Sequence, residues 1–304
     1  MGWFIAQRIV HAIFAMFVIT VVIFGTVRLS GDPARMMISD EAPHEQYLEM
    51  RRLLLLDRPI PEQYWRWVSQ AAQGDFGISL RYQIPVSELV STRLPATLEL
   101  AVAAYGFTLL MGLTIGGYSA AFRGSVLDAA ARLLAVMGQA APNFWMGIML
   151  VLVFAVWLNW LPSGGRGEWR HLVLPAITLG WAPVAGLMRI TRSSMIEVLS
   201  SDYVRLARVK GVGETSVLWK HAFKNGALPI LTFASLVFLG LIRGSVIVET
   251  VFFWPGIGLL VLEGVNNRDF QVVQAIVLLF SSWVVFGNLI VDILYVYLNP
   301  KIKH

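Results

Sequence analysis

The sequence predicts an all-α integral membrane protein with six transmembrane helices. Hydrophobic residues make up 57% of the chain and charged residues only 14%, and the mean hydropathy is +0.66. Several apolar runs reach the ~20 residues that a helix needs to cross a bilayer. These runs are continuous and lack the two-residue alternation of a membrane β-barrel, so we expect helices rather than strands.

The six expected spans are separated by polar connections of unequal length. The first apolar run follows Arg8 as a signal peptide would, but it is too long and has no small-residue cleavage site, so we expect an uncleaved span. The predicted spans are Ile9–Val27, Ala96–Phe122, Ala129–Leu161, Leu172–Ile190, Pro229–Val248 and Val272–Leu298. The chain accordingly divides into residues 1–29 (first helix), 30–93 (loop domain) and 94–304 (a core of five helices).

The distribution of lysine predicts the orientation. An even number of spans leaves both termini on one side, and all five lysines (Lys210, Lys220, Lys224, Lys301 and Lys303) fall on that side. Basic residues favour the cytoplasmic side of a membrane, so we expect both termini in the cytoplasm. The large loop after the first span is then extracytoplasmic. The net charge of +5 does not require a nucleic-acid partner.

The extracytoplasmic loop contains packing residues, so it is more than a linker. Tyr47, Met50, Leu53 and Leu54 recur at helical spacing, and residues 60–67 (IPEQYWRW) have the pattern of a helix that starts with proline. The aromatic residues of this helix fit a helix lying among lipid headgroups. They also fit a docking surface for a partner outside the membrane, and the sequence leaves both interpretations open.

A polar, mostly basic loop runs from Asp202 to Pro229 between the fourth and fifth spans. Its first part has helical periodicity that ends at Gly211 and Gly213, and a second amphipathic run from Val217 to Phe223 leads to Pro229, where we expect the next span to begin. A short cationic and apolar helix suits a groove on another protein. The charges alone would equally suit an anchor on anionic lipid.

The basic loop resembles the cytoplasmic loop of ABC importer permeases, in the form typical of the dipeptide/oligopeptide/nickel permease family. The matching residues are YVRLARVKG (203–211) followed by HAFKN (221–225) and Leu228-Pro229. The resemblance extends along the chain through SGDP (30–33), DRPIPEQY (57–64), GDFGISL (74–80), RLPATLEL (93–100), PNFW (142–145), ETVF (249–252) and WPGIG (254–258). Three departures are Ser30, Phe253 and Arg243, where the family more often has a proline, a small residue and an apolar residue or glycine.

The resemblance implies a permease subunit in the bacterial inner membrane and a set of partners. These partners are a second, homologous permease subunit, one or two ATPase subunits that bind the ATP and Mg²⁺, a periplasmic solute-binding protein and the membrane lipid. The chain itself would need no cofactor. A coupling helix at about 202–213 would contact the ATPase through Tyr203, Arg205, Ala207, Arg208, Lys210 and Gly211. Asp75, Trp254 and Pro255 would contact the binding protein. Di- and oligopeptides are the first expectation for the cargo, with nickel chelates, glutathione and sugar-derived solutes as alternatives.

Three polar residues in the apolar runs are candidates for the translocation pathway. Arg243 lies deep in the fifth span, where a charge costs roughly 3 kcal/mol, so it could line the pathway, pair with another polar group or reach the interface. Asn288 and Asp292 are four residues apart and share a helix face, which also suits hydrogen bonding between helices. Pro142, Pro175 and Pro183 predict kinks, either in a moving gate or in fixed helices.

The sequence argues against enzyme chemistry in this chain. It has no phosphate-binding loop, no HExxH zinc motif and no cysteine. An intramembrane protease would need a histidine at membrane depth near Ser281 or Ser282. An ion-driven transporter would need repeats and coupling carboxylates, and Asp292 alone offers little support for that alternative.

Overall fold

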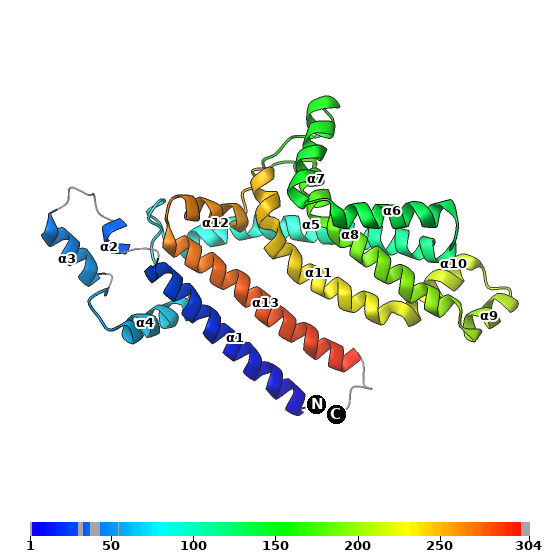
Figure 1. The fold of residues 1–304 in the computed structure, drawn as a ribbon, viewed down its shortest axis with the longest axis horizontal. Helices are drawn as coiled ribbons and strands as arrows, with labels where there is room; N and C mark the ends of the chain where they lie inside the picture. Colours follow the sequence, from blue (N-terminus) through cyan, green and yellow to red (C-terminus); the bar gives the residue numbers. More distant parts are fainter. Residues whose placement is uncertain (1, 30–32, 37–42, 54, 299–304) are drawn as a thin grey trace. The chain divides into compact units, whose positions relative to one another are not determined.

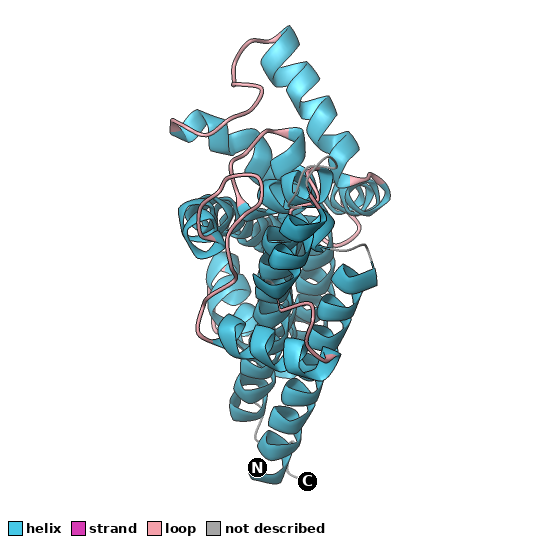
Figure 2. Ribbon diagram, turned by 90° about the vertical axis from the view of Figure 1, so that its left-hand side faces the viewer, coloured by secondary structure: helices cyan, strands magenta, loops and turns pink. Residues whose placement is uncertain are grey.

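Helices form the structure throughout the part of the chain described by the computed structural model, residues 2–29, 33–36, 43–53 and 55–298 (Figures 1 and 2). The predictions that concern Ser30–Asp32, Leu54, Lys301 and Lys303 lie outside these residues. An isolated bridge joins Ile78 to Pro85. The helices are α1 (Gly2–Leu29), α2 (Pro33–Met36), α3 (His44–Leu53), α4 (Ile60–Ala72), α5 (Val86–Ala121), α6 (Val126–Ala140), α7 (Asn143–Leu150), η1 (Val151–Trp157), α8 (Trp169–Leu199), α9 (Asp202–Val209), α10 (Glu214–Ser216), η2 (Val217–Ala222), α11 (Phe223–Val251), α12 (Ile257–Asn266) and α13 (Phe270–Leu298).

Five helical segments among the described residues are long and apolar enough to cross a membrane: 5–29, 86–121, 169–199, 214–251 and 270–293. The remaining predicted span, Ala129–Leu161, is a bent pair of helices, α6 with α7–η1, that turn by 109°. The bend lies at Pro142, so the predicted kink there is confirmed. Ala141, which precedes Pro142, is extended (φ −82°, ψ 125°), as the ring of the following proline requires.

The helix that contains the predicted fifth span begins earlier than Pro229. It runs continuously from Glu214 to Val251, and Pro229 lies inside it. The π-helical stretch η2 (Val217–Ala222) lies at the start of this long helix, before the proline. Pro175 and Pro183 are likewise inside α8.

The chain forms two compact units. One contains residues 96–259 and the end of α13 from Ile290, and the other contains residues 2–95 and 260–289. In the first unit α8 is the central helix, packed against α6, α7 and α11. Glycine permits the closest approach of α5 to α8, because a Cβ atom on Gly116 would lie 2.6 Å from the carbonyl oxygen of Met188. A Cβ atom on Gly112 would likewise lie 2.9 Å from Leu187 Cβ, so these two glycines let α5 pack closely on α8.

In the second unit α1 is covered by α4 and runs beside the first part of α13 (Figure 1). The helix predicted from Ile60 is confirmed, with Pro61 in its first turn. Tyr64 hydrogen-bonds Thr20 of α1 over 2.8 Å, and its ring packs edge-on against Phe17 and Phe24. Tyr64 is therefore a packing residue, whereas Trp65 is exposed.

Candidate functional site

The helix α9 is the first of three short helical segments between α8 and α11, and one of its side chains is fully buried. Val204 is 0% exposed and fixes the helix to the rest of its unit. Tyr203, Leu206 and Val209 are exposed and recur at three-residue spacing, so they form one open apolar stripe. Ala207 is half-buried. A short helix with a fixed base and an exposed apolar stripe is suited to contact a partner.

The end of α9 is a rigid turn. The Gly211 N–H donates to the Arg208 carbonyl over 2.9 Å and the Val212 N–H to the Ala207 carbonyl over 3.2 Å, which is the hydrogen-bond pattern of a Schellman motif. Gly211 has φ +77°, a left-handed conformation that side chains with a Cβ adopt at a cost. The predicted break of the helix at Gly211 is therefore confirmed, and its reason is this turn.

The cations of α9 differ in their environments. Arg208 makes a two-point ion pair with Glu214, at 2.8 and 3.2 Å, which ties α9 to α10. Arg205 is exposed, with its guanidinium 4.0 Å from Asp202, and Lys210 is exposed as well. The structure thus gives Arg208 an internal role and leaves Arg205 and Lys210 at the surface.

A buried ion pair ties the turn between α5 and α6 to α8. Asp128 is 1% exposed and accepts hydrogen bonds from Ser119 Oγ (2.6 Å), Arg192 Nε (2.7 Å), Arg192 Nη2 (3.0 Å) and Gly124 N (3.0 Å). The sequence analysis did not identify this pair. The available signal was Ser125, which caps α6 by accepting from the Asp128 N–H in the pattern Ser-x-x-Asp.

A second buried network holds the turn between α11 and α12. Glu249 is 0% exposed and accepts from Thr97 Oγ1 (2.7 Å), Ser245 Oγ (2.9 Å) and the Leu259 N–H (2.9 Å). Next to it, the indole N–H of Trp254 donates to the Ala96 carbonyl over 2.8 Å. These contacts join α5, α11 and the start of α12.

The three residues predicted to dock a binding protein differ in their exposure. Trp254 is 1% exposed and its indole is bonded internally, so its side chain has no surface to offer a partner, which corrects that prediction. Pro255 is half-buried in the same turn. Asp75 is exposed, and its Oδ1 accepts from the Gly77 N–H over 2.9 Å.

The predicted pathway residues lie on two long helices. Arg243 of α11 is exposed although it is inside a membrane-spanning segment, and Asn288 of α13 is exposed too. Asp292 is half-buried one turn further along α13. Exposed polar groups in a span need a water-filled path or another subunit beside them.

These features define the class of the protein. Long apolar helices, polar groups exposed along the spans and a rigid amphipathic helix in a connecting loop are those of a membrane transport component that works with partners. Among the described residues, no cluster of His, Cys, Asp or Glu could hold a metal ion.

The chain belongs to the binding-protein-dependent transport system inner membrane component family, whose model matches residues 112–304. The model of the N-terminal region of these membrane components matches residues 1–101. The protein is thus the permease subunit of an ABC importer, a multi-pass protein of the bacterial inner membrane that is not itself catalytic. This membership decides against the ion-driven transporter and the intramembrane protease. It also implies an ATPase and a binding protein as partners.

Relatives with similar sequences are permeases for glutathione. The glutathione transport system permease protein GsiC of Escherichia coli strain K12 is 40% identical over 302 residues, which is 99% of both chains. GsiC of Salmonella paratyphi A is 41% identical with the same coverage.

Solved structures support the fold. The MetNI methionine ABC transporter in an inward-facing conformation has a TM-score of 0.57 at 14% identity, covering 69% of this chain and 96% of that chain. An amino acid ABC transporter with histidines has a TM-score of 0.53 at 16% identity, covering 69% and 94%.

Proposed function

We propose that this subunit forms half of the translocation pathway of an importer for short peptides, and that α9 is the helix through which an ATPase drives it. The observation that carries the proposal is the geometry of α9. Its base is fixed by Val204 and its end by the turn at Gly211, while Tyr203, Leu206 and Val209 stay open to a partner.

The proposed orientation puts α9 and both termini in the cytoplasm. Lys210, Lys220 and Lys224 are exposed in or next to the loop that carries α9, and basic loops favour the cytoplasmic side. Residues 30–85 and the turn between α11 and α12 are then extracytoplasmic, where a binding protein delivers its solute.

Protein docking explains α9 better than anchoring to lipid. A lipid anchor needs only positive charge near the surface, worth about 1 kcal/mol per residue. It does not need a capped helix whose base is buried and whose last turn is fixed by two backbone hydrogen bonds. A rigid lever must keep its shape under load, so those constraints are what a coupling helix requires.

The motion of α9 has a direct path into the membrane part of the unit. α9 contacts α8 and η2, and below it Met195 of α8 packs with Leu218 and Ala222 of η2 and Ala120 of α5. The Asp128–Arg192 pair then links α8 to the turn between α5 and α6. Closure of the ATPases would therefore move α5, α8 and α11 together. ATP shifts this equilibrium only if the docking contacts differ between the two states.

The proposed cargo follows the relatives, which are permeases for glutathione, a small peptide. A second permease subunit completes the pathway in this proposal, because Arg243 and Asn288 are exposed along spans of the isolated chain. One or two ATPase subunits would bind the ATP and Mg²⁺.

Charge reversal at two positions tests the docking role. In the assembled importer in proteoliposomes, Arg205→Glu should abolish the stimulation of ATP hydrolysis by loaded binding protein and most solute uptake. Gly211→Val should act in the same direction, because it strains the turn that ends α9. Uptake and hydrolysis are measured on the same vesicles.

Lys220→Glu is the matched control, since it reverses a charge in the same loop but outside α9. Docking through α9 predicts nearly normal coupling in this variant. Equal losses in Arg205→Glu and Lys220→Glu would instead mean that the loop acts through its net charge on lipid. Unchanged uptake with Arg205→Glu and Gly211→Val would refute the coupling role.

A further inference from the structure

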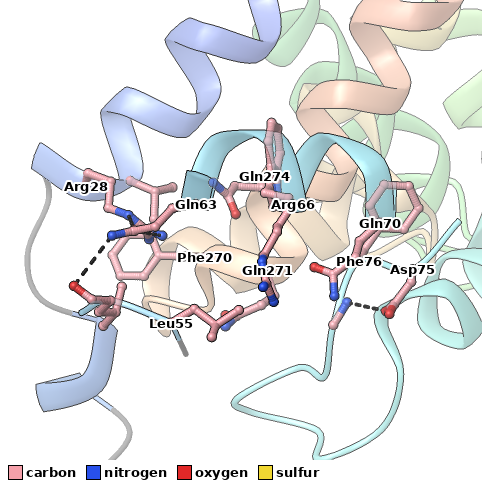
Figure 3. A pocket seen from close by; sticks show the side chains of 14 residues that line it. Arg28, Leu55, Gln63, Arg66, Gln70, Asp75, Phe76, Phe270, Gln271 and Gln274 are labelled. Atoms are coloured by element: carbon pink, nitrogen blue, oxygen red, sulfur yellow. Dashed lines mark hydrogen bonds between the residues drawn. The ribbon is translucent and has the colours of Figure 1, made fainter. Parts of the chain in front are cut away.

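A cavity of about 200 Å³ lies in the second unit (Figure 3). The end of α1, the helix α4, the loop that follows α4 and the start of α13 form its walls. The four elements belong to the same compact unit. None of the roles assigned above to coupling or to the pathway uses this cavity.

The cavity contains a buried acceptor without a partner. Gln271, in the first turn of α13, has a buried carbonyl oxygen Oε1 that makes no hydrogen bond. Gly77 lies next to this side chain, since a Cβ atom on Gly77 would be 3.5 Å from Gln271 Cγ. A buried acceptor left unpaired costs about 1–3 kcal/mol, so a ligand that brings a donor to Gln271 Oε1 would gain this contact. Gln70 and Gln274 contribute two further amide side chains to the lining.

On one side of the cavity, the polar groups of Gln63 already have hydrogen-bond partners within the protein. Gln63 Oε1 accepts from Arg28 Nε (3.0 Å) and Nη2 (2.8 Å), and its Nε2 donates to the Arg58 carbonyl over 2.7 Å. Gln63 is buried, so this part of the wall is part of the fold. The groups left to bind a ligand are those at the other side.

Opposite charges line the open side of the cavity. Arg66 is half-exposed and only loosely paired with Glu62, at 3.3 Å. Asp75 uses one carboxylate oxygen for the Gly77 N–H, at 2.9 Å, which leaves Oδ2 for another donor. The rings of Trp67, Phe76 and Phe270 complete the lining. A guanidinium, a carboxylate, amides and aromatic rings together match a zwitterion with peptide groups.

We propose that this cavity binds a small zwitterion, a free amino acid or a dipeptide as small as glycylglycine, on its way to the pathway. Its volume equals the share of about seven water molecules in the liquid, so it holds a ligand of that size and not a whole oligopeptide. Asp75 takes the ammonium group, Arg66 takes the carboxylate, and Gln271 Oε1 accepts from an ammonium or amide N–H group of the ligand. The inference takes the peptide class of cargo from the proposed function.

Binding of three related dipeptides to the full chain in nanodiscs tests the proposal. The probes are glycylglycine, its N-acetyl derivative and its C-terminal amide, and isothermal titration calorimetry measures their dissociation constants. Each blocked derivative should bind at least tenfold more weakly than glycylglycine, because each loses one charge-assisted contact.

The variants assign the two ends. Asp75→Asn should weaken the binding of glycylglycine about tenfold and leave the binding of the N-acetyl derivative unchanged. Arg66→Gln should also weaken the binding of glycylglycine about tenfold, but leave the binding of the C-terminal amide unchanged. Gln271→Leu should weaken the binding of all three probes about fivefold. Gln73→Leu, an exposed glutamine outside the cavity, should bind like the unmodified chain. Circular dichroism establishes that each variant is folded.

Two results would overturn the inference. One is the absence of saturable binding to the unmodified chain at millimolar dipeptide, which would mean that water alone satisfies Gln271. The other is equal weakening of all three probes by Asp75→Asn and Arg66→Gln, which would remove the assignment of the ends. Neither result bears on the coupling role of α9, because the ATPase and its nucleotide are absent from this measurement.

Discussion

Removing Arg192 should destabilise this protein more than any other single change of a charged residue discussed here. Asp128 accepts four hydrogen bonds, and Arg192 supplies two of them together with the nearest positive charge. Arg192→Gln strands a carboxylate that is 1% exposed. Breaking a buried pair in this way costs about 3–5 kcal/mol. Arg132, with its guanidinium 3.8 Å away, offsets part of the loss, so we expect about 3 kcal/mol.

Replacing Asp128 should destabilise the protein less than replacing Arg192, because the two side chains are buried to different degrees. The Arg192 side chain is 23% exposed and can turn its charge towards water when Asp128→Asn removes the carboxylate. We expect about 2 kcal/mol for that variant, which loses charge-assisted hydrogen bonds. The destabilisation of the double variant should be about 2 kcal/mol smaller than the sum of the two single destabilisations.

Reversible unfolding of the full chain in mixed micelles, followed by circular dichroism, measures these differences. Arg189→Gln is the control, because Arg189 is an exposed arginine on the same helix. The reasoning fails if Arg192→Gln is no more costly than this control, or if the two deletions are additive within about 0.5 kcal/mol.

Two further predictions concern packing and α9. Gly256→Ala should destabilise the chain by about 1–3 kcal/mol, because a Cβ there would lie 2.4 Å from Thr97 Oγ1 and 2.5 Å from the Glu249 carboxyl group. Gly240→Ala is the control and should be nearly neutral, because a Cβ there would have nothing within 4 Å. Equal unfolding free energies for the two variants would contradict this reasoning. Val204→Ala should cost about 2 kcal/mol of stability, while Leu206→Ala should leave stability within about 0.5 kcal/mol and reduce the stimulation of the partner ATPase. A Leu206→Ala subunit with full stimulation would argue against the exposed stripe as the contact.

The elements that depend on local pattern could be predicted from the sequence. The helix from Ile60 and the short helix that ends before Gly211 follow from proline and glycine at their ends, and the spans follow from hydropathy. The sequence also indicated a break at Pro142. The 109° angle of that break depends on how α6 and α7 pack against α8, which no local pattern contains.

The candidate site divides in the same way. α9 was predictable because its residues are contiguous. The buried pairs were not, since Asp128 and Arg192 are 64 residues apart and Thr97 and Glu249 are 152 apart. The prediction for Trp254 rested on the family resemblance, which carries a position along the chain but not its burial. Only the fold shows that the indole N–H reaches the Ala96 carbonyl.

The exposure of Arg243 on a membrane-spanning helix bears on how the cell must produce this subunit. An arginine facing hydrocarbon costs about 2.5–3.5 kcal/mol, a large share of the stability of a typical domain. A copy synthesised without its neighbour would carry that penalty and be a substrate for membrane proteases. We therefore expect balanced synthesis of the two permeases to control how much importer accumulates, and unpaired copies to be short-lived.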